Sequence, residues 1–314
     1  MKSQTPLDSI INSHPTWALW SASPEDYQVQ VMLTEIERTQ KGEIILQSFD
    51  WGHKPGEYFY PASTIKMPVA ALALQRLNEL GIQGLDPHSI MRTGRGRSPQ
   101  TTALADTTAK GGLPSIAHYI RQIFLVSNNQ AYNRLFEFLG QAYINEGLQK
   151  IGLHNSRILH RVGVSGFDTL TNRYLNPVGF WQEDTLLYYQ GERYSEWYDD
   201  LGLHGQVRGV GYLSGDEIIN EPFDFRHKNY HSLADLNGIL LRIVLPEAFP
   251  PEQRFKLRLE DYLLLRQPMG QLPRESQYPA YPNKEDNYGK FWLFGDRDEA
   301  YRIPDHITIY NKVG

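Results

Sequence analysis

The period of the hydrophobic and polar positions changes along the chain, and the changes predict strands first and helices afterwards. Strand-like patterns cover residues 29–37 and 43–49. Residues 67–80 are apolar around most of a helical circumference, so we expect a buried helix there. Two amphipathic segments, 113–125 and 131–139, are separated by a polar break and predict further helices. The pattern therefore indicates a chain of mixed α and β structure.

The C-terminal half continues with a helical pattern and ends with an alternating one. A helix is expected at 232–245, and the alternation of apolar residues over 305–314 predicts a final strand. At the other end of the chain, a short helix is expected within residues 1–20, with Thr5 as its cap and Pro6 at its first position.

Composition narrows the class of protein. The chain has 314 residues and a net charge of −5, which gives no electrostatic footprint for nucleic acid. It has no cysteine, and its ten histidines show no tight ligand spacing, so neither a metal nor a cofactor is expected. No apolar run is long enough to span a membrane, and the N-terminus lacks the apolar core of a signal peptide.

A single Ser-x-x-Lys, formed by Ser63 and Lys66, stands at the start of the predicted buried helix. Residues three apart share a helix face, so the two side chains can meet. A serine hydroxyl becomes a nucleophile when a base takes its proton, and a lysine withdrawn from water can be neutral enough to do so. The N–H groups at a helix N-terminus would stabilise negative charge on an attacked carbonyl. This placement favours an enzyme.

The same motif has a plainer interpretation. About one Ser-x-x-Lys is expected by chance in a chain of this length. Ser63 would then be an N-cap and Lys66 a solvated residue of the first helical turn. The polar break that contains Ser127 and Asn129 is, by itself, typical of a helix-capping turn.

Taken together with Lys312 and Gly314 at the end of the chain, these segments resemble the penicillin-recognising serine hydrolases, and within them the class A β-lactamases. That family carries Ser-x-x-Lys at a helix start, Ser-x-Asn about sixty residues later and Lys-Thr/Ser-Gly on a late strand. The resemblance implies an α+β fold of the β-lactamase and DD-peptidase type, with an antiparallel sheet subdomain, a mainly helical subdomain and a pocket at their junction.

The resemblance also divides the chain, which is expected to form one domain over residues 1–314. The sheet subdomain would comprise 1–60 and 232–314, and the helical subdomain 61–180. An aromatic-rich insertion is expected at about 177–231. It forms either an aromatic wall beside the pocket, suited to a large or apolar acyl group, or a satellite core.

The roles implied by the resemblance are those of a serine ester mechanism. Ser63 would attack a strained or peptide-like carbonyl, with Lys66 as the candidate base. Ser127 would pass a proton to the departing nitrogen, and Asn129 would hold Lys66 and a substrate amide. Lys312 would lower the proton affinity around Ser127 and attract a substrate carboxylate.

One departure from the family concerns release of the acyl group. The family's Glu-x-x-Leu-Asn motif is best matched by residues 172–176, where Asn172 takes the place of the glutamate that activates water. Fast β-lactam hydrolysis is therefore not expected. Asn176 is the expected substrate-binding asparagine of this motif. Glu183 is either a replacement for the glutamate or a solvated loop carboxylate.

Other departures lie at the C-terminus. Val313 replaces the hydroxyl residue that helps to bind a substrate carboxylate, and Gly314 is the expected substrate-contacting glycine. In the family the chain runs on past this glycine to a second oxyanion-hole N–H, beside that of Ser63, and to further strands and a helix. The sequence is therefore expected to lack the C-terminal strands and helix.

The function expected from the resemblance is a serine hydrolase that forms an acyl-enzyme on Ser63 with β-lactam, D-Ala peptide or ester substrates and deacylates slowly. The alternative is a non-catalytic relative that binds peptidoglycan or peptide fragments. The partner would be a small molecule or a cell-wall peptide. Because relatives act outside the cytoplasm, a periplasmic or otherwise extracytoplasmic location is expected.

Overall fold

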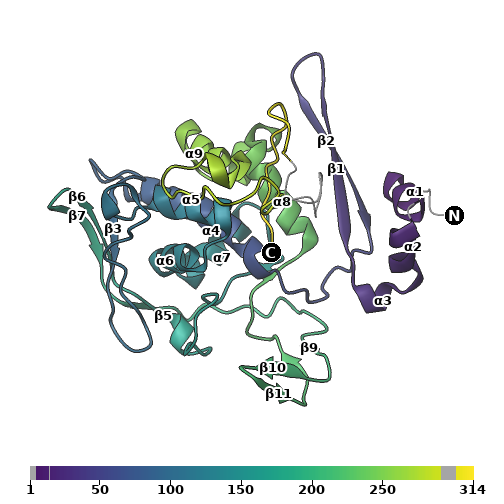
Figure 1. Ribbon diagram of the computed structural model, residues 1–314, viewed down its shortest axis with the longest axis horizontal. Helices are drawn as coiled ribbons and strands as arrows, with labels where there is room; N and C mark the ends of the chain where they lie inside the picture. The colour runs from purple at the N-terminus through teal and green to yellow at the C-terminus, as the bar shows by residue number, and fades with distance from the viewer. Residues whose placement is uncertain (1–4, 14, 291–301) are drawn as a thin grey trace.

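The fold combines a helical body, small antiparallel sheets and a hairpin that stands beside them (Figure 1). It is a computed structural model that describes residues 5–13, 15–290 and 302–314. The mixed α and β class expected from the sequence is confirmed. No helix within these described ranges has the length and apolar character needed to cross a membrane.

The helices occur mainly in the middle of the chain and again after residue 232. The α-helices are α1 (Pro6–Ser13), α2 (Pro15–Ala22), α3 (Pro24–Tyr27), α4 (Lys66–Leu80), α5 (Ile116–Val126), α6 (Asn129–Leu139), α7 (Gln141–Lys150), α8 (Leu233–Val244) and α9 (Leu259–Gly270). Short 3₁₀ helices are η1 (Ala62–Ile65), η2 (Lys110–Gly112), η3 (Thr171–Arg173), η4 (Pro246–Ala248), η5 (Pro251–Gln253) and η6 (Pro273–Glu275).

The strands are short, and every pairing between named strands is antiparallel. They are β1 (Val31–Arg38), β2 (Ile44–Trp51), β3 (Ile90–Thr93), β4 (Ser156–Arg157), β5 (Tyr174–Leu175), β6 (Val178–Gln182), β7 (Thr185–Gln190), β8 (Arg193–Tyr194), β9 (Val207–Arg208), β10 (Tyr212–Ser214), β11 (Glu217–Ile219), β12 (Phe223–Asp224) and β13 (Tyr230–His231). The larger units are the β1–β2 hairpin and the β3–β6–β7 sheet.

Helix α4 is the centre of the body, and it contacts α5, α6, α7, α8 and α9. Its small and aliphatic residues are enclosed; Ala70, Ala71 and Leu72 have no exposed surface. Close approach is aided by Gly147 of α7, where a Cβ would lie 2.9 Å from Leu72 Cδ2. The buried helix predicted for 67–80 is therefore confirmed, and it gives the site a rigid support.

The other predicted helices and the first two strands are also confirmed, with small shifts of their ends. The amphipathic segments became α5 and α6, and the 232–245 pattern became α8. In the β1–β2 hairpin, Val31 lies opposite Trp51 and Arg38 lies opposite Ile44. Helix α9 was not predicted; it packs against α5 and contributes Leu265 to the core.

The prediction of a final strand over 305–314 is wrong. Within the described residues this segment pairs with no strand, and it lies along the helical body instead of beside the β1–β2 hairpin (Figure 1). Its alternating apolar residues have another explanation, because Ile307 and Ile309 pack with Ile303 and Leu272 in a small separate cluster. The alternation of apolar residues therefore reflects one buried side of an extended segment and does not show that the segment belongs to a sheet.

The segment expected as an insertion divides into two parts. Its first part, β6 and β7, completes the sheet with β3. Its later part contains the β10–β11 hairpin and the β9–β12 pair, below the helical body in Figure 1. A satellite core of Tyr58, Leu203 and Tyr230 fastens this part to the chain that precedes the helical body.

Candidate active site

Ser63 lies in a tight turn that leads into α4. Thr64 donates from its backbone N–H and from Oγ1 to Pro61 O, at 3.1 and 2.6 Å. Ala62 has a φ of 46°, a left-handed conformation that costs a non-glycine residue about 1–3 kcal/mol. The capping positions of η1 and α4 are Pro61 and Ile65, so Ser63 is not an N-cap. Its half-buried hydroxyl bonds to no residue in the described part of the chain, which leaves the oxygen available for chemistry.

Lys66 is the first residue of α4, and its side chain is fully buried. Its Nζ donates to Ser127 O at 2.6 Å, to Asn129 Oδ1 at 2.6 Å and to Ser127 Oγ at 3.2 Å. Burial lowers the pKa of Lys66 to about 8. Lys66 is therefore not a solvated first-turn residue, and an amine with this pKa is partly neutral near neutral pH, as a general base must be.

The turn between α5 and α6 supplies the acceptors for Lys66. Helix α5 ends at Ser127 in the left-handed conformation, with φ at 54°, where its N–H donates to Ile123 O at 3.1 Å. Asn128 then caps α6 by accepting a hydrogen bond from Ala131 N at 2.9 Å. The helix-capping interpretation of this segment is thus right. The same turn also directs Ser127 and Asn129 toward one amine.

Ser127 Oγ lies between two lysine amines. Lys312 Nζ donates to it at 2.8 Å, opposite the 3.2 Å bond from Lys66. Burial, reinforced by the nearby Lys66 charge, lowers the pKa of Lys312 to about 7. A serine hydroxyl has two acceptor sites and one proton, so two donors leave that proton for another partner. The arrangement is suited to passing a proton to a departing group.

Lys312 reaches this position although the segment that carries it is not a strand. Lys290, which precedes Lys312 by 22 residues in the chain, is buried, and its Nζ donates to Met269 O at 2.7 Å, Ile309 O at 2.8 Å and Asn311 Oδ1 at 2.9 Å. Asn311 Nδ2 in turn donates to Gly289 O. These bonds join the end of α9 to the residues just before Lys312. We call Lys290 and Asn311 the terminal clamp.

Gly314 packs against the turn that contains Ser63. A Cβ on Gly314 would lie 2.7 Å from Pro61 O and 3.0 Å from Thr64 Cγ2, so a side chain would push the two segments apart. The structure therefore brings the predicted residues of the Ser63 turn, the Ser127 turn and the chain end to one place. Contact of Gly314 with a substrate stays a prediction.

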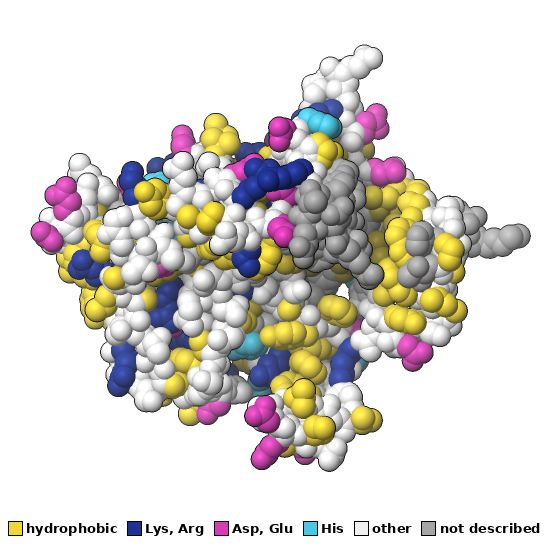
Figure 2. Space-filling view, in the orientation of Figure 1, with side chains coloured by type: hydrophobic (Ala, Val, Ile, Leu, Met, Phe, Trp, Pro, Cys, Tyr) yellow, Lys and Arg dark blue, Asp and Glu magenta, His cyan; other side chains and the backbone are white. Residues whose placement is uncertain are grey.

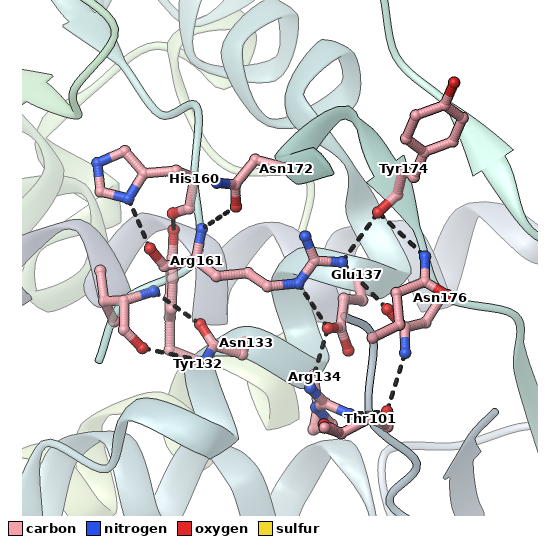
Figure 3. Close-up of polar contacts among 12 residues, drawn as sticks. Thr101, Tyr132, Asn133, Arg134, Glu137, His160, Arg161, Asn172, Tyr174 and Asn176 are labelled. Atoms are coloured by element: carbon pink, nitrogen blue, oxygen red, sulfur yellow. Dashed lines mark hydrogen bonds and ion pairs between the residues drawn. The ribbon is translucent and has the colours of Figure 1, made fainter. Parts of the chain in front are cut away.

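Asn176 is enclosed in a polar network beside α6 (Figure 3). Its Nδ2 donates to Gly94 O at 2.7 Å and to Thr101 O at 3.0 Å, and its Oδ1 accepts from Arg161 at 3.0 Å. With no exposed surface, the side chain holds neighbouring loops together. This corrects the expectation that Asn176 touches the substrate directly.

Asn172 also lies inside the loop and not beside Lys66. Its Oδ1 accepts from Arg161 N at 3.0 Å, and its Nδ2 donates to Asp168 O at 2.8 Å. The loop approaches the site instead at Gly163, where a Cβ would lie 2.1 Å from Asn129 Nδ2. Gly163 has a φ of 61° and carries no carboxylate. The acceptors of Lys66 are likewise all neutral groups within the described part of the chain.

A buried carboxylate anchors this loop to α6. Glu137 Oε1 accepts from Arg161 Nε at 2.7 Å and from Arg134 at 2.9 Å, and Figure 3 shows the two guanidinium groups meeting at this carboxylate. Asn133 adds two bonds to the backbone of Val162, one from its Nδ2 and one to its Oδ1. Together these contacts fix residues 160–176, and through Gly163 they fix the space beside Asn129.

Glu183 is a solvated turn residue, which is the plainer of its two interpretations. It lies exposed between β6 and β7 with a φ of 52°. In Figure 1 this turn is at the far edge of the molecule from the C-terminus, where Lys312 and Gly314 lie.

Three residues that position the site without belonging to it could not be predicted from the sequence. Lys290, Glu137 and Gly163 belong to no motif, and their partners lie far away in the sequence. The one available signal was Glu137, an acidic residue among the apolar residues of α6. A buried carboxylate implies a cationic partner. No group of His, Asp and Glu side chains in the described ranges is arranged to hold a metal ion.

Comparison with known proteins gives the same assignment as the geometry. The family model described as the β-lactamase enzyme family matches residues 23–178. This match includes Ser63, Lys66, Ser127 and Asn129. No curated protein matches the chain.

Among solved structures, this chain is similar to β-lactamases from Xanthomonas campestris and Desulfarculus baarsii and to an ancestral class A β-lactamase, each at 16% identity. The respective TM-scores are 0.39, 0.40 and 0.38. The similarity covers 81%, 81% and 84% of this chain and 69%, 68% and 75% of the other chains.

A serine on a helix-start turn, a buried lysine beside it and a second serine between two amines define a candidate acyl-transfer site. The family-model match shows that residues 23–178, which carry this site's two serines and Lys66, are similar to the β-lactamase enzyme family.

Replacing Glu137 by leucine should destabilise the protein strongly, because it leaves two buried guanidinium groups without their carboxylate. We expect a loss of about 3–5 kcal/mol in the free energy of unfolding, measured by urea denaturation. The exposed pair of Arg38 and Glu247 provides the control, and Glu247→Gln should change stability by less than about 1 kcal/mol. Equal effects of the two substitutions would contradict the anchoring role of Glu137.

Replacing Lys290 by methionine should loosen the terminal clamp while the helical body stays folded. We expect amide hydrogen exchange in residues 303–314 to accelerate about tenfold, with exchange in α4 unchanged, because local opening is governed by local contacts. The side chain of Lys284, in the same loop, contacts only the Tyr288 ring among the contacts described, so Lys284→Met is the matched control. Unchanged exchange in Lys290→Met would show that other contacts hold the segment.

Proposed function

We propose that the protein is a serine hydrolase in which Ser63 forms an ester with the acyl group of its substrate. The observation that supports this most directly is the placement of Ser127 Oγ between Lys66 and Lys312, beside the turn that carries Ser63. A proton can then be taken from one hydroxyl and delivered to a leaving group through neighbouring atoms. The match of residues 23–178 to the β-lactamase family model supports the same reaction class.

In the proposed mechanism, neutral Lys66 accepts the Ser63 proton as Ser63 Oγ attacks the substrate carbonyl carbon. The bond to the leaving nitrogen or oxygen then breaks. Lys66 returns a proton through Ser127, whose own proton passes to the leaving atom, so the charges balance at each step. Ser63 Oγ makes no hydrogen bond to Lys66 in the unliganded site. Such bonds commonly shorten when substrate is bound.

The substrates proposed are β-lactams, D-Ala peptides or esters, since each presents a carbonyl with a departing nitrogen or oxygen. Lys312 is placed to attract a negatively charged substrate, although its Nζ already donates to Val313 O at 2.6 Å. Val313 has no hydroxyl to add a hydrogen bond, so binding of a carboxylate would rest on Lys312 alone at this position.

Release of the acyl group is proposed to be slow. A water molecule needs a base to attack the ester, and the family's glutamate position is not occupied by a carboxylate in this chain. Gly163 approaches Asn129 from the loop, and Asn172 is bonded within the loop. The acyl-enzyme should therefore accumulate.

A non-catalytic binding role is the second candidate. It is favoured by the missing bond between Ser63 Oγ and Lys66 and by the lack of a carboxylate among the described acceptors of Lys66. In that case the same pocket would hold a peptidoglycan or peptide fragment without reacting. The two candidates differ in one measurable respect, which is covalent attachment to Ser63.

Incubation with benzylpenicillin should add one acyl group to the folded protein, seen by intact-mass spectrometry. The adduct should persist for hours because deacylation lacks its usual base. Ser63→Ala should show no adduct, whereas Ser48→Ala, at an exposed serine of β2, should react like the original protein. If the folded protein gains no mass from benzylpenicillin or from an activated ester, the binding role replaces the catalytic one.

The rate of acylation should rise with pH. Below pH 7 the buried amines are mostly protonated, and Lys66 can accept the Ser63 proton only after losing its own. With pKa values of about 8 for Lys66 and about 7 for Lys312, we expect the rate to increase through this interval and to level off above it. Lys66→Arg retains the charge but stays protonated, so it should react slowly at every pH. A flat profile would exclude a titrating lysine base.

A further inference from the structure

A cavity separate from the candidate active site lies between the 160–176 loop and the later part of the insertion. Its volume is about 550 Å³, within the usual range for small-molecule pockets. None of the serines and lysines of the candidate active site lines it, so its function has to be sought apart from acyl transfer. Figure 2 shows hydrophobic side chains intermixed with basic and acidic ones around the β10–β11 hairpin, which belongs to this part of the insertion.

The charges around the cavity balance, which points to an uncharged ligand. Besides two histidines, the lining contains as many cationic side chains as carboxylates, namely Arg161, Arg173 and Lys228 and Asp168, Glu221 and Asp224. Two of these charges are already paired, because Arg161 bonds to Glu137 at 2.7 Å and Asp224 bonds to Arg226 at 2.6 Å. The remaining charges are again equal in number, so the cavity offers little net attraction to an anion or a cation.

Aromatic side chains supply the apolar part of the lining. The rings of Tyr212 and Phe223 meet edge to face with their centroids 4.9 Å apart, so they support one another. Trp197 differs, because its half-buried indole makes no ring contact and no hydrogen bond with the described part of the chain. An indole without a partner beside a cavity is available to pack against the apolar face of a ligand.

Polar groups with unused hydrogen-bonding capacity line the same cavity. Glu221 has only a 3.5 Å contact with the Tyr212 hydroxyl, and its Oε2 has no partner among the described residues. Arg173 donates from Nη1 to Ser195 O at 3.1 Å, which leaves its Nε and Nη2 unused in the described ranges. A carboxylate only accepts hydrogen bonds and a guanidinium only donates them. Together they suit a ligand group that does both, and a hydroxyl is such a group.

We propose that this cavity is a binding site for a saccharide, in which a sugar ring packs on Trp197 and its hydroxyls bind to Glu221 and Arg173. A pyranose is uncharged, its hydroxyls both donate and accept, and its C–H groups form an apolar face. These three properties match the balanced charges, the unused polar groups and the unpartnered indole. The site is independent of the proposed acyl transfer at Ser63, and it gives the aromatic-rich insertion a function of its own.

The test titrates cellobiose, maltose and chitobiose into the full chain and follows binding by two-dimensional NMR. We expect at least one disaccharide to shift the Trp197 indole N–H signal and amide signals of the 160–176 loop. Sorbitol, which has hydroxyls but no ring, should not. Trp197→Ala should weaken binding about tenfold, equivalent to about 1.4 kcal/mol, because the sugar loses its apolar contact. Glu221→Gln should weaken it several-fold, since a charge-assisted hydrogen bond becomes a neutral one.

Two substitutions outside the cavity provide the controls. Tyr189→Ala removes a tyrosine that is 59% exposed on β7, and Glu217→Gln changes an exposed carboxylate on β11. Neither residue lines the cavity, so both variants should bind as the original protein does. Glu221 is itself exposed, so Glu221→Gln tests the site even if Trp197→Ala does not fold.

Binding that neither Trp197→Ala nor Glu221→Gln weakens would overturn the proposal, and so would the absence of shifts with all three disaccharides. Ser63→Ala should bind the sugars like the original protein. Loss of binding in Ser63→Ala would place the sugar at the candidate active site and overturn the separate cavity. The two proposals fail separately, because acylation of Ser63 and binding of a sugar are measured by different signals.

Discussion

A buried lysine amine needs an acceptor for each of its protons, and that requirement organises the site. Lys66 is held on the central helix α4, where surrounding helices prevent it from moving toward water. The groups that accept its hydrogen bonds must therefore lie on neighbouring segments of the chain. The turn between α5 and α6 brings Ser127 and Asn129, and the chain end brings Lys312 to the other side of Ser127. The enclosure of this amine and the placement of Ser127, Asn129 and Lys312 are thus parts of one arrangement.

The central part of the fold and of the site could be predicted from the sequence because its signals are local. Apolar residues around a full helical circumference indicate burial of α4, and two amphipathic runs with a polar break indicate the α5–α6 turn. The positions of Ser63, Lys66, Ser127 and Asn129 followed from these elements and the motif spacing. Hydrogen bonds join Lys66 to Ser127 and Asn129, whereas the Ser63 hydroxyl makes none to a described residue, and the individual catalytic roles remain predictions.

The remaining features depend on contacts between residues distant in the sequence. The alternation of Ile307 and Ile309 is identical for a strand and for an extended segment with one buried side. What separates the two is that no strand in the described ranges pairs with this segment. Asn176 matched a motif asparagine, but its partners Gly94, Thr101 and Arg161 lie outside the motif. Buried polar residues take their meaning from such partners, which a local pattern does not contain.

The loop of residues 160–176 is buried at its two ends and exposed in its middle. Arg161 and Asn176 are enclosed and bonded, whereas Ser165, Gly166 and Thr169 are exposed. The bonds of Arg161 and Asn176 involve none of these three exposed residues, so substitutions at Ser165, Gly166 and Thr169 should leave both ends of the loop in place. The attached and the replaceable parts of this loop are thus separate, and a transplanted loop with the same two ends would keep its attachment to α6.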